Sequence, residues 1–138
     1  GTIGTTLKAG VLVEANVKVK TGLIVVPVAN GQLYFQAYKW TQPEVTFSLT
    51  VELEDTVGLV ASERAIYAAG GTRLIRLKSL GSGSKSFQID MAAKYDAIGN
   101  YDNNDGNTTV TLEGHAVASA ADSLSFTTTV INTLSAVP

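Results

Sequence analysis

Few residues in this chain of 138 residues have the types and the spacing that a reaction or a metal site requires. The run YDNNDGN, Tyr101–Asn107, places Asp102 and Asp105 before a glycine, as the start of a calcium-binding loop does. The two carboxylates are one residue short of that spacing, and no glutamate closes the loop. This run is therefore predicted to be a plain turn.

Two other local patterns are equally weak. The run GSGSKS, Gly81–Ser86, lacks the four-residue gap of a phosphate-binding loop and opens a predicted strand instead of a helix. His115 is the only histidine, and the chain has no cysteine that could share a metal ion with it. No serine lies in a G-x-S-x-G context. We therefore expect no catalytic, cofactor-binding or metal-binding residue, and no enzymatic activity.

The composition excludes several classes of function. The net charge is -2, so the chain lacks the basic surface that binding to a phosphate backbone requires. The absence of cysteine excludes a disulfide framework. The longest apolar runs, such as LIVVPV, are far shorter than the roughly 20 residues that cross a bilayer. Because the first residues, GTIGTT, show no signal-peptide pattern, we expect neither a signal peptide nor a membrane partner.

The element with the clearest pattern is the run EVTFSLTVELED, Glu44–Asp55, where apolar and polar residues alternate strictly. Such alternation indicates a strand with one face on the core and the other on a polar surface. The apolar set, expected to face the core, is Val45, Phe47, Leu49, Val51 and Leu53. The polar set on the opposite face is Thr46, Ser48, Thr50, Glu52 and Glu54.

The rest of the chain has the same period of two, with one interruption. Alternating segments are predicted to be strands over residues 11–20, 23–28, 32–40, 72–80, 86–95, 108–119 and 124–134. The interruption, about residues 56–69, reads as one short helix that Asp55 or Thr56 caps and Gly70-Gly71 ends. We therefore expect a mainly β fold, an antiparallel β-sandwich or barrel with one flanking helix, in a single domain over residues 1–138.

The last predicted strand, SFTTTVINTL, has no charged residue. Natural edge strands are usually protected by charges, prolines or bulges, because an open edge pairs readily with another chain. This strand therefore either lies at the centre of one sheet or pairs with copies of the same chain.

The order of these segments resembles that of the tail tube (major tail) proteins of long-tailed bacteriophages. The resemblance extends from Leu33 to Val137. It starts with the alternating strand FSLTVELED, the helical run TVGLVASERAIYAAGG and the returning strand TRLIRLKSL. It continues through SFQIDMAAKYDAI, the turn in DNNDGN and the strand NTTVTLEGHAVA, and ends with LSFTTTVINTLSAV.

The resemblance implies a β subunit with a helix on its flank, made in the host cytoplasm and built into the virion. Six such subunits close into a ring, and the rings stack into a hollow tube that carries DNA and meets other tail proteins. In such a tube the set Thr46, Ser48, Thr50, Glu52 and Glu54 suits the lumen, because its carboxylates repel the charged DNA backbone. The alternative is that this face meets bulk solvent.

A second hypothesis belongs to another class of function. A secreted or surface β-sandwich module, immunoglobulin-like or carbohydrate-binding, would be a monomer with exposed aromatic residues as a ligand platform. The candidates for that platform are Tyr34, Tyr38, Trp40 and Tyr101. A tube subunit would instead bury these side chains in its core or in contacts between subunits.

Overall fold

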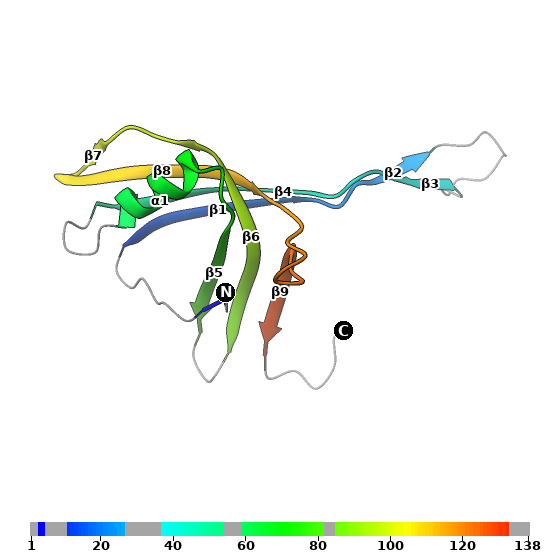
Figure 1. The fold of residues 1–138 in the computed structure, drawn as a ribbon. Coiled ribbons are helices and arrows are strands. Elements are labelled where there is room, and N and C mark those ends of the chain that lie inside the picture. Colours follow the sequence, from blue (N-terminus) through cyan, green and yellow to red (C-terminus); the bar gives the residue numbers. More distant parts are fainter. Residues whose placement is uncertain (1–2, 5–10, 27–36, 54–58, 82–84, 133–138) are drawn as a thin grey trace.

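The chain folds as one strongly curled antiparallel sheet with a short helix on its concave side and a two-stranded arm that projects from one end (Figure 1). The computed structural model describes residues 3–4, 11–26, 37–53, 59–81 and 85–132. The mainly β class and the single short helix are confirmed within this part of the chain. Of the two expected architectures, the sheet is closest to an open half of a barrel.

Seven strands form the main sheet and two form the arm. The main path runs β1-β4-β8-β6-β5, with β7 added beside β8 and β9 beside β6, and β2 pairs with β3. The strands are β1 (Leu12–Lys20), β2 (Leu23–Val26), β3 (Ala37–Trp40), β4 (Glu44–Glu52), β5 (Arg73–Leu80), β6 (Ser86–Ile98), β7 (Asp102–Asn104), β8 (Asn107–Ala116) and β9 (Phe126–Ile131). None of the described residues forms a helix long and apolar enough to cross a membrane.

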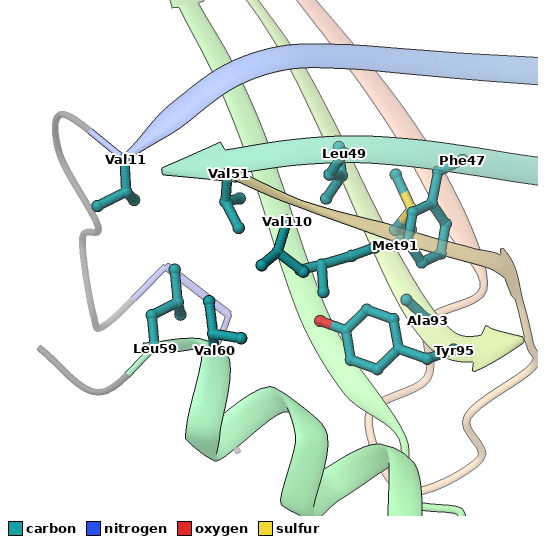
Figure 2. Packing of buried hydrophobic residues seen from close by; sticks show 11 residues of the cluster. Val11, Phe47, Leu49, Val51, Leu59, Val60, Met91, Ala93, Tyr95 and Val110 are labelled. Atoms are coloured by element: carbon teal, nitrogen blue, oxygen red, sulfur yellow. The ribbon is translucent and has the colours of Figure 1, made fainter. Parts of the chain in front are cut away.

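Strand β4 positions the core as its alternation predicts. Val45, Phe47, Leu49 and Val51 are buried, and the polar residues between them are half-buried on the opposite face. Leu53 is the exception: it lies after the end of β4, and 37% of it is exposed. Figure 2 shows the buried side chains packed between the sheet and the start of the helix.

Helix α1 (Leu59–Ala68) lies inside the predicted range of residues 56–69. Its proposed N-terminal caps, Asp55 and Thr56, lie outside the described residues. The predicted end at Gly70-Gly71 is confirmed. The amide of Gly70 donates to the carbonyl of Tyr67 and that of Gly71 to Ile66, each at 2.9 Å, while Gly70 has a φ of 63°. These two bonds form the glycine-dependent motif that satisfies the last carbonyls of a helix.

The run Tyr101–Asn107 forms a tight hairpin, which confirms the predicted turn. Asp105 and Gly106 both have positive φ, at 51° and 92°, and they join β7 to β8. Two such residues between paired strands form the mirror-image turn that matches the twist of a hairpin. The side-chain oxygen of Asn103 accepts a bond from the Gly106 amide at 2.8 Å, so this polar run satisfies its own turn. The short strand β7 inside this run was not predicted.

Strands β8 and β9 lie end to end along the same side of β6. Ala93 of β6 pairs with Ala116 at the end of β8, and Met91 pairs with Phe126 at the start of β9. The nine residues between them leave this path and return to it, held by a bridge between Ser119 and Leu124. The long strand β6 therefore joins the two halves of the curled sheet.

The arm continues the β1 and β4 pair beyond the body of the molecule (Figure 1). At the junction, Thr41 donates from its amide and its hydroxyl to the carbonyl of Gly22, at 2.7 and 3.0 Å. Gly22 has a φ of 75°, and an added Cβ would collide with the Thr41 carbonyl, so the junction requires glycine. An ion pair of 2.7 Å between Lys20 and Glu44 lies beside it.

Candidate assembly surfaces

The polar set of β4 lies on the face of the sheet that turns away from the core. Directly paired residues of antiparallel strands share a face, so the register of β1 and β8 extends this surface. Thr46 lies between Lys18 and His115, and Thr50 lies between Glu14 and Thr111. The structure thus brings four of the five candidate residues together: Thr46, Ser48, Thr50 and Glu52. Glu54 lies outside the described residues.

This surface, here called the polar face, carries both signs of charge. Lys18 and Lys20 point to the same side as the polar set of β4, a consequence of register that the sequence pattern of one strand does not contain. Its lysines are Lys18, Lys20 and Lys94, and its carboxylates are Glu14, Glu44, Glu52, Asp96 and Glu113. Five carboxylates against three lysines leave the polar face with a net charge of two negative units.

Several charged groups of the polar face are paired with one another. Nδ1 of His115 lies 2.9 Å from the carboxylate of Asp96, and Lys20 pairs with Glu44. The hydroxyls of Thr50 and Thr111 meet at 3.4 Å across the strands. These hydroxyls and isolated ion pairs make the polar face hydrated and weakly acidic. They provide no pocket or nucleophile with an adjacent base.

Four strands of the described main sheet have an open edge: β1, β5, β9 and the three-residue strand β7. Strand β1 carries lysines and a bulge near Val13, and β5 carries Arg73, Arg76 and Lys78, so both have the usual protection against edge pairing. Strand β9, FTTTVI, has no charge and no proline. It lies beside β6 on one side only, which answers the question left open by the sequence: it is an edge strand.

Inside the curl, a buried carboxylate fixes the helix to the sheet. Glu63 is 2% exposed and accepts a hydrogen bond of 2.9 Å from the hydroxyl of Tyr95. Arg73 of β5 pairs with the same carboxylate at 2.8 Å. Burial first, and the negative charge of Glu63 second, raise the pKa of Tyr95, so the phenol stays protonated. These three groups lie on the wall of a hollow of about 510 Å³ between β1 and β5, but they bind one another.

Sequence reasoning missed Glu63, although a signal was present. The sequence predicts an apolar stripe on the helix, formed by Leu59, Val60, Ile66 and Tyr67, of which Tyr67 is exposed in the structure. Residue 63 lies three to four residues from Leu59, Val60 and Ile66 on the same stripe. A charged residue at such a position predicts a buried partner. A second ion pair lies on the opposite face of the sheet, where Arg76 holds Asp90 through two bonds of 2.7 Å.

Comparison with solved structures gives a likeness that covers most of the chain. No protein-family model matches the chain, and no curated protein matches its sequence. A chain from the virion of a native gene transfer agent particle has a similar structure, with a TM-score of 0.53 at 14% sequence identity. The likeness covers 85% of each of the two chains. The two chains therefore share a fold over most of their length.

Proposed function

We propose that this chain is a structural subunit of a phage-like virion. Copies of it close into rings, six to a ring, and the rings stack into the hollow tail tube through which DNA passes. The observation that carries the proposal is the structural likeness to a chain of a gene transfer agent virion, which extends over most of both chains. The role is mechanical, with other tail proteins as partners and without catalysis or a cofactor.

The open edge of β9 supports self-association. Its backbone groups face outward along a strand without charge, and a second chain can satisfy them by strand pairing. A contact between two different surfaces of the same subunit repeats with a fixed rotation, and it closes into a ring when that rotation divides a full turn.

The polar face suits the lumen of such a tube. Thr46, Ser48 and Thr50 keep it hydrated, and the surplus of carboxylates on the polar face disfavours adhesion of a polyanion. The lysines of β1 make the repulsion weaker than the sequence of β4 alone suggests.

The binding-module hypothesis meets a geometric difficulty. Tyr38, Trp40 and Tyr101 are exposed, as that hypothesis expects, while Tyr34 lies outside the described residues. The rings of Tyr38 and Trp40, however, meet edge to face at 86°, which is not the flat platform on which a sugar ring stacks. Tyr101 belongs to another part of the chain and lies against the guanidinium of Arg64.

Light scattering during dilution tests the proposal. A tube subunit is expected to give masses in multiples of the monomer at high protein concentration, and smaller species as the solution is diluted. The binding module is expected to stay a monomer throughout and to bind an oligosaccharide or protein ligand through its exposed aromatic residues. A monomer at every concentration contradicts the proposal.

A further inference from the structure

The arm presents an apolar face that is exposed in the described part of the chain. Leu23 pairs with Trp40 and Val25 with Tyr38, so these four side chains lie on one face of the two-stranded arm. The exposed fractions are 47% for Leu23, 63% for Trp40, 43% for Val25 and 69% for Tyr38. A two-stranded hairpin alone is only marginally stable in water, and a continuous apolar surface marks a contact site. The apolar face of the arm therefore has the character of a contact site.

A second uncovered apolar surface lies at the far end of β5, β6 and β9. On the concave side of these strands, Met91 is fully buried, but the next residues outward on that side emerge from the core. Phe87 and Val130 face each other directly there, with 45% and 60% exposed. Together with the half-buried Leu77 and Ile89 they form what we call the distal face.

The two surfaces cannot meet within one chain. The arm extends the β1 and β4 pair outward, whereas the distal face lies at the ends of β5, β6 and β9, away from it (Figure 1). The arm is two strands wide and the distal face three, both surfaces are apolar, and neither carries a charged side chain among the residues named above. A repeating contact between two different surfaces of one chain is the type that builds rings or filaments.

We propose that the apolar face of the arm docks on the distal face of a neighbouring copy, with Tyr38 and Trp40 as the aromatic anchors of the contact. Aromatic side chains that enter a desolvated apolar surface supply most of the free energy in many interfaces. The inference rests on self-assembly as proposed above, and it assigns one pair of surfaces that hold the copies together.

The only tryptophan of the chain, Trp40, lies on the arm and reports this contact directly. In the assembled wild-type protein we expect its emission to shift to the blue, and quenching by acrylamide to fall severalfold relative to the diluted protein. The change Val130→Asp, on the distal face, should abolish both effects. Ile131→Asp is the matched control, because it places the same charge on the same strand but on the opposite face.

The arm offers an equally close pair of variants. Val25→Asp places a charge on the apolar face and should prevent docking, while Ile24→Asp, one residue away, places it on the other face and should not. If Val130→Asp does not fold, as circular dichroism would reveal, Phe87→Ser tests the distal face instead.

A mixing experiment separates this contact from the alternatives. Val130→Asp retains Trp40 on an intact arm but lacks the distal face, whereas Trp40→Ser has an intact distal face and no tryptophan. Mixing the two should restore protection of Trp40, and mixing Val130→Asp with the double variant Trp40→Ser/Val130→Asp should not. Protection in Val130→Asp alone would mean that arms pair with arms. If the protein assembles while Trp40 stays exposed, the proposed docking of the arm is wrong but self-assembly stands. If the wild type stays a monomer, both the docking of the arm and the proposed self-assembly are wrong.

Discussion

At the scale of single residues, the ion pair of Asp90 and Arg76 should make the stability of the fold fall at low pH. Asp90 is buried, and its hydrogen bonds from Arg76, more than from Gln88, hold the pKa of its carboxyl below the usual 3.8. A carboxyl whose pKa is lower in the folded than in the unfolded protein stabilises the fold at a pH above its unfolded-state pKa. This contribution to the free energy of unfolding is lost as the pH falls below 3.8. We expect Asp90→Asn to lower the free energy of unfolding by about 1.5–3 kcal/mol at neutral pH.

Denaturant melts of the wild type and Asp90→Asn across a pH series check this. The difference in free energy of unfolding between the two proteins should become steadily smaller below pH 3.8. A gap of constant size through that range would contradict the assignment, because it would show that the charge of Asp90 contributes nothing.

The buried phenol of Tyr95 has the opposite pH dependence. Burial and Glu63 raise its pKa above the usual 10.0, so the folded protein keeps the phenol neutral where the unfolded chain ionises it. Its contribution is complete below pH 10 and is lost as the pH rises beyond that value. Tyr95→Phe should cost about 1–3 kcal/mol, because Glu63 loses a buried hydrogen bond. In alkaline melts the variant should lose less stability than the wild type; equal losses would exclude Tyr95 as the cause.

At the scale of elements, the alternation of β4 predicts that two neighbouring residues, Phe47 and Thr46, contribute very differently to stability. Phe47 is 4% exposed and packs edge to face on Tyr95 at 6.0 Å, while Thr46 lies on the polar face. Phe47→Ala should lower the free energy of unfolding by about 3–5 kcal/mol. Thr46→Ala should leave it almost unchanged, since Thr46 is only half-buried and lies on the face away from the core. Similar losses for the two variants in urea would mean that the faces are assigned wrongly.

The sequence predicted the individual strands and the helix better than it predicted which strands pair with one another. The strict alternation of β4 and the glycine pair after α1 depend on local geometry, and both predictions are confirmed. The pairing of β6 with both β8 and β9 depends on contacts distant in the chain, and no local pattern contains it. For the same reason the lysines of β1 were not predicted to share the polar face. Glu63 was within reach, because its place in the helical stripe is a local fact.

At the scale of the whole molecule, the charge of the polar face is expected to govern passage of DNA and not assembly. Glu52 and Glu113 lie on that face, paired with Thr109 and Ser48, away from the core. The double change Glu52→Lys, Glu113→Lys turns a surplus of two carboxylates into a surplus of two lysines. A wall of that sign should hold DNA in a salt-dependent way, since each neutralised phosphate releases counterions.

Particles that carry these two substitutions should assemble normally but deliver DNA poorly, and high salt should relieve the defect. The isosteric pair Glu52→Gln, Glu113→Gln removes the repulsion without adding attraction, so it serves as the control. Normal delivery by the lysine variant at low salt would argue that the polar face lies outside the DNA path.

Electron microscopy of the purified protein at high concentration tests the proposed tube most directly. We expect stacked rings around an open channel, with Thr46, Ser48, Thr50 and Glu52 on the inner wall in a map that resolves side chains. A field of separate monomers would contradict self-assembly, and a tube with these residues on its outer surface would contradict the assignment of the lumen.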